Sequence, residues 1–202
     1  MGGTHMRKKI VGIIIFMLLI TTILPMTALA GDPENPEIED ELNDTYLPFL
    51  DIVSAWFYEK ADEPEYLYTA LKVQSINLKA NAVLSIRWSY DGKEYVTGFD
   101  TYIFQDDVFR SGDPKSASSW QWRNMPECDG TIDRTTNVIT WKVLKSNIGN
   151  PEKGDVLTNT RAAAVPDGYS SFIYFLTGRD YRDFAPNTQD EYGLDYVIQY
   201  GG

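Results

Sequence analysis

An Asp-Gly pair between two alternating runs of residues restricts the fold of this chain more than any other feature. Leu84–Tyr90 (LSIRWSY) and Lys93–Phe99 (KEYVTGF) are separated only by Asp91-Gly92. A two-residue turn of this kind needs positive φ at its central positions, which Asp and Gly tolerate, and it joins neighbouring antiparallel strands. The stretch therefore predicts a β-hairpin, which commits the chain to an antiparallel sheet.

Short strand-like runs separated by turns continue after residue 30, and no stretch has the periodicity of an amphipathic helix. Further strands are predicted at Leu50–Tyr58, Tyr66–Val73, Trp120–Trp122, Val138–Leu144, Val156–Val165, Phe172–Leu176 and Leu194–Tyr200, with Thr101–Gln105 extending the hairpin. We expect a surface loop at 106–119, turns at 124–136 and one helical turn at 145–149. Eight or nine short strands with frequent turns predict an all-β fold, an antiparallel β-sandwich.

The first 30 residues carry the pattern of an export signal. The basic residues Arg7–Lys9 precede the apolar run Ile10–Leu24, and Ala28-Leu-Ala30 supplies small residues at the expected cleavage positions. An uncleaved anchor is the alternative, but a run of roughly 15 apolar residues is short for a membrane span of ~20. We therefore expect residues 1–30 to be a removed leader. Residues 31–202 then form a single secreted domain with no membrane attachment.

Charge and histidine content exclude several classes of function. The leader holds three of the 18 basic residues and none of the 29 acidic ones, so residues 31–202 carry a formal charge of −14. Such a charge disfavours nucleic acid and anionic membrane surfaces as partners. The single histidine, His5, lies before the leader's apolar run. Without a later histidine, Ser-His-Asp or Cys-His catalysis, the usual zinc sites and His-ligated haem are excluded.

The single cysteine, Cys128, excludes an intrachain disulfide. It lies in the turn-like segment Pro126–Gly130. We expect an unpaired thiol there, with a cross-link between two chains as the alternative.

An acidic turn before the first predicted strand is the leading candidate metal site. Asp40, Asn43, Asp44 and Asp51 place four oxygen ligands within twelve residues, and calcium prefers oxygen ligands of this kind. The spacing differs from that of an EF-hand loop, and a solvated acidic turn is the alternative. If calcium binds, we expect a structural role. Asn43-Asp44-Thr45 is also an N-glycosylation sequon, and a glycan on Asn43 would compete with the metal.

A second acidic segment spans Arg179–Glu191. Its oxygen-bearing residues are Asp180, Asp183, Asn187 and Asp190, and two arginines, Arg179 and Arg182, lie among them. Salt bridges to these arginines are the preferred interpretation, with a second cation site as the alternative.

Several aromatic residues are candidates for a surface that stacks on sugar rings. Trp120 and Trp122 follow a polar loop and would lie on one face of a strand. Tyr102 is the preferred third member, with Trp88 or Tyr90 as alternatives. A sandwich core also needs large rings, so burial in the core is the competing interpretation for each of them.

Three short motifs together resemble a known superfamily. They are Asp40…Asn43-Asp44…Leu50-Asp51-Ile52, Lys145-Ser-Asn-Ile-Gly149 before Lys153-Gly-Asp155, and Asp183-Phe-Ala-Pro186. They resemble secreted prokaryotic domains of the DOMON-like or family-9 carbohydrate-binding-module-like superfamily. The resemblance implies a jelly-roll-like sandwich with structural calcium and ligand binding without catalysis. Asn43 stands where that superfamily commonly has glycine, and the missing histidine disfavours a haem-binding version.

These observations predict a secreted, non-catalytic binding domain with structural Ca²⁺ and no haem or zinc. A glycan or another cell-surface component is the expected partner. The first alternative is an adhesive or self-assembling surface protein that associates through an unpaired edge strand. A glycan-processing enzyme is the second, although no carboxylate pair stands out as its acid and nucleophile.

Overall fold

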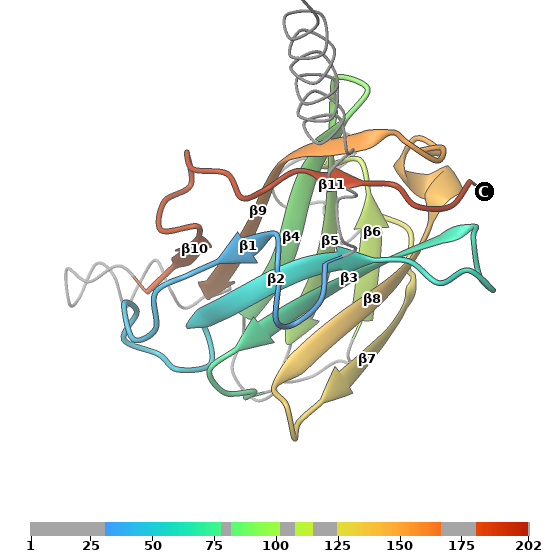
Figure 1. Cartoon of the computed structure of the whole chain (residues 1–202). Coiled ribbons are helices and arrows are strands. Elements are labelled where there is room, and N and C mark those ends of the chain that lie inside the picture. The colour runs from blue at the N-terminus through green and yellow to red at the C-terminus, as the bar shows by residue number, and fades with distance from the viewer. Residues whose placement is uncertain (1–30, 78–81, 102–107, 115–124, 167–180, 202) are drawn as a thin grey trace, which may run out of the picture.

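Two antiparallel sheets pack face to face in the computed structural model, which describes residues 31–77, 82–101, 108–114, 125–166 and 181–201 (Figure 1). The first sheet has the order β1 (Ile38–Glu39), β2 (Ile52–Tyr58), β3 (Tyr66–Val73), β8 (Val138–Leu144) and β7 (Asp129–Asp133). The second has the order β10 (Asp183–Ala185), β9 (Val156–Pro166), β4 (Ala82–Tyr90), β5 (Lys93–Thr101) and β6 (Val108–Gly112), with β11 (Tyr196–Val197) also paired to β9. The predicted antiparallel β-sandwich is confirmed.

The predicted hairpin is the centre of the second sheet. β4 and β5 pair over their whole lengths, from Ala82 with Thr101 to Tyr90 with Lys93. Asp91 and Gly92 both have positive φ, at 48° and 69°, as a two-residue turn requires. The helical turn predicted after β8 is a 3₁₀ turn, η3 (Lys145–Ile148), which ends at Gly149 with φ of 87°.

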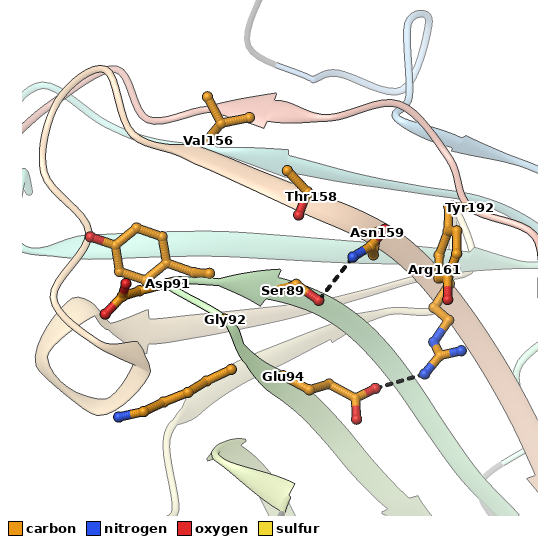
Figure 2. A pocket seen from close by; sticks show the side chains of 11 residues that line it. Ser89, Asp91, Gly92, Glu94, Val156, Thr158, Asn159, Arg161 and Tyr192 are labelled. Carbon is orange, nitrogen blue, oxygen red and sulfur yellow. Dashed lines mark hydrogen bonds and ion pairs between the residues drawn. The ribbon is translucent and has the colours of Figure 1, made fainter.

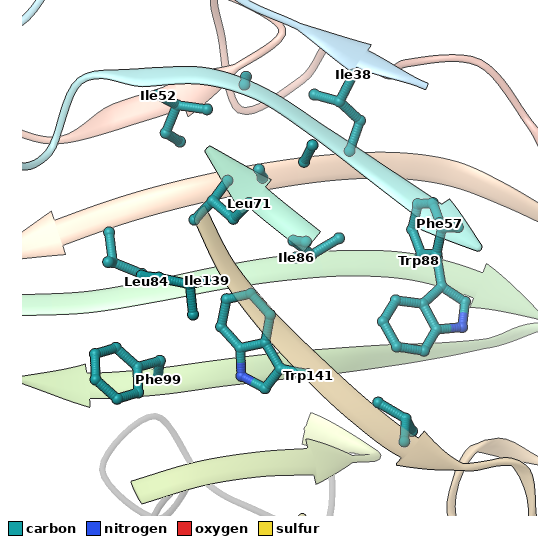
Figure 3. Close-up of a cluster of buried hydrophobic side chains, with 14 of the residues drawn as sticks. Ile38, Ile52, Phe57, Leu71, Leu84, Ile86, Trp88, Phe99, Ile139 and Trp141 are labelled. Atoms are coloured by element: carbon teal, nitrogen blue, oxygen red, sulfur yellow. The ribbon is translucent and has the colours of Figure 1, made fainter. Parts of the chain in front are cut away.

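Large apolar side chains from both sheets meet in one core (Figure 3). Phe57 of β2 meets the Trp88 ring of β4 edge-on, with ring centroids 5.6 Å apart. The Trp141 indole N–H of β8 donates to the Gly98 carbonyl of β5 at 3.0 Å, which joins the two sheets. Trp88 is completely buried, so this alternative member of a sugar-stacking surface belongs to the core instead.

Two segments expected to be irregular form edge strands instead. β6 lies within the predicted loop 106–119 and β7 within the turn-rich 124–136. Each has only five residues and adds to an existing strand, β5 or β8, through its backbone. Short edge strands of this kind depend on their neighbours more than on their own apolar pattern. Phe109 of β6 packs on Gly130 of β7, where a Cβ would lie 2.1 Å from the ring.

The chain ends also differ from the sequence-based expectation. The described residues contain eleven strands. Two of them, β1 and β10, are short additions of two and three residues that the sequence did not predict. The predicted strand Leu194–Tyr200 is reduced to β11. The strands predicted at Trp120–Trp122 and Phe172–Leu176, residues 102–105 and the leader 1–30 lie outside the described residues. Within the described ranges, no helix has the length and apolar character needed to cross a membrane.

Candidate metal centre and polar pocket

Carboxylates from segments far apart in the sequence converge beside the start of β2. Asp40 follows β1, Asp44 lies in the next turn, and Asp183 begins β10. One carboxylate oxygen of each residue lies within 4.8 Å of those of the other two. The buried Asp51 immediately precedes β2, and its charge adds to the burial that raises the pKa of both Asp40 and Asp183. These four residues form the acidic cluster.

Backbone hydrogen bonds hold the acidic cluster together. Asp183 Oδ2 accepts the N–H of Ile52 at 2.6 Å, and this bond joins residues 131 positions apart. Asp183 Oδ1 accepts the N–H of Phe184 at 3.0 Å. In the return direction, the N–H of Asn187 donates to Asp40 Oδ1 at 3.0 Å. The β10 segment is thereby fastened both to the start of β2 and to the turn after β1 (Figure 1).

Asn43 positions the turn. It adopts positive φ, 67°, which Asn tolerates better than most residues. In this conformation its backbone N–H donates to Asp51 Oδ2 at 2.8 Å. Its side-chain carbonyl accepts Gln74 Nε2 at 2.7 Å. Asn43 was predicted as a metal ligand, and in the structure it contacts the acidic cluster through its backbone N–H. Its side chain is exposed, and glycosylation at this sequon stays a prediction.

Burial and the repulsion between neighbouring carboxylates raise the pKa of three members of the acidic cluster, Asp40, Asp51 and Asp183. Burial raises the pKa of Asp183 to about 7; the Ile52 amide opposes this rise, and the charges of Asp40, Asp44 and Asp51 add to it. The pKa of Asp40 rises to about 6, again through burial first. Burial likewise raises the pKa of Asp51. No lysine or arginine among the described residues forms an ion pair with any of the four.

Three buried oxygens around the acidic cluster have no hydrogen-bond partner among the described residues. They are Asp40 Oδ2, Asp51 Oδ1 and the Thr45 hydroxyl. Buried polar atoms nearly always have a hydrogen-bond partner, so three unsatisfied oxygens in one place indicate that a partner is missing. The available ligand atoms are all carboxylate or hydroxyl oxygens, the hard ligands that Ca²⁺ and Mg²⁺ prefer. The residues of the acidic cluster therefore suit a divalent cation that prefers oxygen ligands. Ca²⁺ is the better match because it accepts irregular coordination geometry.

The second acidic segment contributes Asp183 to the acidic cluster. Asp183 forms no ion pair with a described arginine, so for this residue the geometry favours the alternative interpretation, a cation site, over the preferred salt bridge. The Arg182 guanidinium lies 5.5 Å from the centre of the Phe184 ring. Asn187 contributes its backbone amide, and Asp190 is exposed. Arg179 and Asp180 lie outside the described residues. The sequence carried no spacing signal for Asp183, because its place beside Asp40 depends on the pairing of β10 with β9 and on hydrogen bonds between distant segments.

A second site lies on the outer face of the second sheet. A polar pocket of about 600 Å³ opens among the ends of β4, β5 and β9 (Figure 2). A bulge in β9 shapes it: Arg87 is opposite Arg161, whereas Ser89 is opposite Thr158. Bulges of this kind redirect side chains. Asn159 adopts φ of 53° here and donates from Nδ2 to Ser89 Oγ at 3.2 Å.

The pocket combines an exposed aromatic ring with a fixed charged pair. Arg161 donates to Glu94 Oε1 at 2.7 Å and to the Gln189 carbonyl at 2.8 Å. Its guanidinium lies 5.7 Å from the centre of the Tyr192 ring, which is 51% exposed, and Figure 2 shows the two side by side. Burial acts to raise the pKa of Glu94, but the hydrogen bond from Arg161 and the charges of Arg87 and Arg161 lower it overall.

The predicted sugar-stacking residues Trp120, Trp122 and Tyr102 lie outside the described residues. Tyr90, an alternative member, lines the polar pocket, and its hydroxyl donates to Asp155 Oδ2 at 2.6 Å. Sequence reasoning missed Tyr192, Glu94 and Arg161. Only the Asp-Gly hairpin, whose turn lines the same pocket, was a signal for this region.

Comparison of the chain with protein-family models, with curated proteins and with solved structures finds no match. The geometry therefore defines the class, a β-sandwich with an acidic cluster at one end and a polar pocket on one face.

Proposed function

We propose that this chain is an exported, non-catalytic binding domain whose sandwich is fastened by one calcium ion. The observation that carries the proposal is the acidic cluster. Asp40, Asp44 and Asp51 of one acidic turn and Asp183 of a distant segment converge without a described cationic side chain, and two of them hold buried oxygens without a partner among the described residues. A structural cation resolves both the repulsion and the unsatisfied oxygens.

The ion would act on the chain ends. Asp40 ends the segment that carries β1, and Asp183 begins β10. Both segments are short edge additions that the sandwich holds by few hydrogen bonds. The carboxylates of Asp40, Asp183 and Asp51 repel one another when all are charged. A bound Ca²⁺ would neutralise this charge, and both segments would then be attached to the start of β2. The metal is thus structural in this proposal, and it takes no part in a reaction.

Calcium titration tests the metal site. Isothermal calorimetry on protein treated with EDTA and then dialysed should show binding of one Ca²⁺. Asp44→Asn should abolish the heat of binding, because it replaces one of the candidate ligand carboxylates. Asp44 is exposed and its replacement breaks no hydrogen bond of the fold, so the variant should still fold. Asp190→Asn, an exposed acid of the same C-terminal segment as Asp183, is the matched control and should bind normally. Absence of heat in the unsubstituted protein would exclude the calcium site.

The ligand of the domain, in this proposal, is a neutral glycan bound in the polar pocket. Sugar C–H faces pack on aromatic rings, for which Tyr192 is available, while the oriented Arg161–Glu94 pair and Asn159 match ring hydroxyls. The pocket holds charges of both signs close together, which suits an uncharged polyhydroxyl ligand better than an ion. Trp120, Trp122 and Tyr102 remain the alternative surface.

Retention on immobilised neutral polysaccharides distinguishes the two surfaces. Tyr192→Ala and Glu94→Gln should lower retention at least tenfold if the polar pocket binds the glycan. Trp120→Ala and Trp122→Ala should do so if the predicted tryptophan surface binds it. Tyr200→Ala, a partly exposed tyrosine outside the pocket, is the control. Equal retention of all variants would remove both glycan assignments and leave the calcium site untouched.

A further inference from the structure

A buried glutamate near the beginning of the described chain has no cationic side chain paired with it among the described residues. Glu37 is only 7% exposed. Its Oε2 accepts the N–H of Phe57 at 2.9 Å, and its backbone carbonyl accepts the N–H of Leu194 at 2.7 Å. No described lysine or arginine forms an ion pair with it. A buried carboxylate in this position needs a compensating charge or must hold a proton.

Gly31 lies directly against this carboxyl group. A Cβ on Gly31 would stand 2.1 Å from Glu37 Oε2 and 2.5 Å from Oε1, so a larger residue would have to displace this carboxyl group. The backbone nitrogen and a Cβ share the same α-carbon, which places the Gly31 nitrogen within about 5 Å of the carboxylate. Gly31 is itself buried. Its nitrogen is thus near the one buried carboxylate of this region that lacks a cation.

The charged groups around Glu37 are otherwise accounted for. Burial raises the pKa of Glu37 to about 7; the amide of Phe57 opposes the rise, and the charge of Asp32 adds to it. On the other side lies Tyr196, whose hydroxyl donates to Glu59. Glu59 is already paired with Lys145 at 2.6 Å. The region therefore holds two buried glutamates and one lysine that is fully engaged.

We propose that the α-amino group created at Gly31 by cleavage after Ala30 forms an ion pair with the buried carboxylate of Glu37, so that removal of the leader completes the fold. The inference rests on the proposed export. A signal peptidase would hydrolyse the Ala30–Gly31 peptide bond with one water molecule, and Ala30 would keep the new carboxylate. The new amine takes up a proton near neutral pH, because an α-amino group ordinarily has a pKa of roughly 7.7–8.0.

The precursor and the mature chain differ in the charge of the Gly31 nitrogen, and only the mature chain can form this ion pair. Before cleavage the Gly31 nitrogen belongs to an uncharged amide. After cleavage it is an ammonium group with three donors beside Glu37. The mature N-terminal segment is then tied to the edge of β2 through Glu37 and Phe57. A side chain at position 31 would push the Glu37 carboxyl group away from this nitrogen, whatever the role of glycine in cleavage.

The test uses the full chain expressed with its leader in a secreting bacterial host. N-terminal sequencing should find Gly31 as the first residue. A pH titration of the Gly31 ¹³Cα chemical shift then gives the pKa of the α-amine, which we expect at least one unit above its ordinary range. Glu37→Gln should return the midpoint to that range. Glu39→Gln, an exposed neighbour on β1, should leave it raised.

Acetylation of the mature N-terminus provides a second readout, the thermal stability of the mature protein. It should lower the melting temperature of the mature protein, and the same treatment of Glu37→Gln should have no further effect. An α-amine that titrates in its ordinary range, or acetylation without a thermal effect, would overturn the ion pair. A first residue other than Gly31 would overturn the inference at its first step. Calcium calorimetry on the same sample reports the metal site independently.

Discussion

The two ends of β2 both carry buried carboxylates, and they differ in the source of the compensating charge. Asp51 precedes the strand and lies among Asp40, Asp44 and Asp183. Glu59 follows the strand, and its Oε1 lies 2.6 Å from Lys145 Nζ, with both side chains at most 1% exposed. Glu59 Oε2 also accepts the Tyr196 hydroxyl at 3.1 Å. At the Glu59 end the chain supplies its own cation.

This difference shows that carboxylates of similar burial can differ in whether they need a cation from outside the chain. Lys145 donates to the carbonyls of Pro64 and Tyr200 besides its ion pair with Glu59, so this ammonium is fully satisfied. At the Asp51 end, carboxylates repel one another, and three buried oxygens have no hydrogen-bond partner in the part of the chain that the structure describes. We infer that the Glu59 end is complete as the chain folds, whereas the Asp51 end depends on a cation from solution.

The largest effect is expected at the Glu59 end. Lys145→Met should destabilise the protein by about 3–5 kcal/mol, because it leaves the Glu59 carboxylate buried without its cation. The loss should be the same with calcium and with EDTA when the free energy of unfolding is measured by denaturant titration. Adding Glu59→Gln should recover part of it. A calcium-dependent loss would contradict the independence of the two ends.

Calcium removal should have the next largest effect, and it should act at the Asp51 end. Saturating Ca²⁺ at about 100 times its dissociation constant stabilises the folded state by about 2.7 kcal/mol. For a domain of this size that corresponds to a shift of about 5–10 °C in melting temperature. Differential scanning calorimetry with Ca²⁺ and with EDTA measures it. Asp44→Asn should lose the shift, whereas a Lys145 variant that still folds should keep it.

The pH dependence of the calcium-free protein should expose the raised pKa values of the acidic cluster. The pKa values of about 7 for Asp183 and about 6 for Asp40 exceed the ordinary ~3.9 of an aspartate. The folded state then binds more protons than the unfolded state between about pH 4 and pH 7, so stability falls as pH rises through this window.

In EDTA we expect the free energy of unfolding to fall by about 2 kcal/mol over that window. This is less than the sum of the two pKa differences implies, because coupled carboxylates share protons and their surroundings relax partly. Calcium competes with these protons, so its stabilising effect should grow as pH rises. Denaturant titrations at pH 4.5, 6 and 7.5, with and without calcium, measure both trends. Stability in EDTA that rises over this range would contradict the raised pKa values of the acidic cluster.

The smallest effect is expected for an ion pair with the same N–O distance that is only partly buried. Lys142 Nζ lies 2.6 Å from Glu63 Oε1, the distance found between Lys145 and Glu59, but the two side chains are 25% and 32% exposed. Lys142→Met should therefore lower the melting temperature by no more than about 4 °C. A loss equal to that of Lys145→Met would show that burial is not the deciding variable.

Local sequence signals predicted the parts of the fold that local chemistry determines. The hairpin followed from Asp91-Gly92, and the 3₁₀ turn after β8 from its glycine. β6 and β7 were missed because such edge strands take their conformation from the strands that they join. Most of the candidate metal ligands were predicted, since they lie within one acidic turn.

Asp183 could not be found in the same way. It joins the acidic cluster because β10 pairs with β9 and its carboxylate reaches the amide of Ile52 across the sandwich. By itself the sequence determined an antiparallel β-sandwich and a local set of oxygen ligands, because turn chemistry and side-chain type are local properties. Only the tertiary structure decided which carboxylates meet, and which of them find a lysine, because both depend on pairings between residues far apart along the chain.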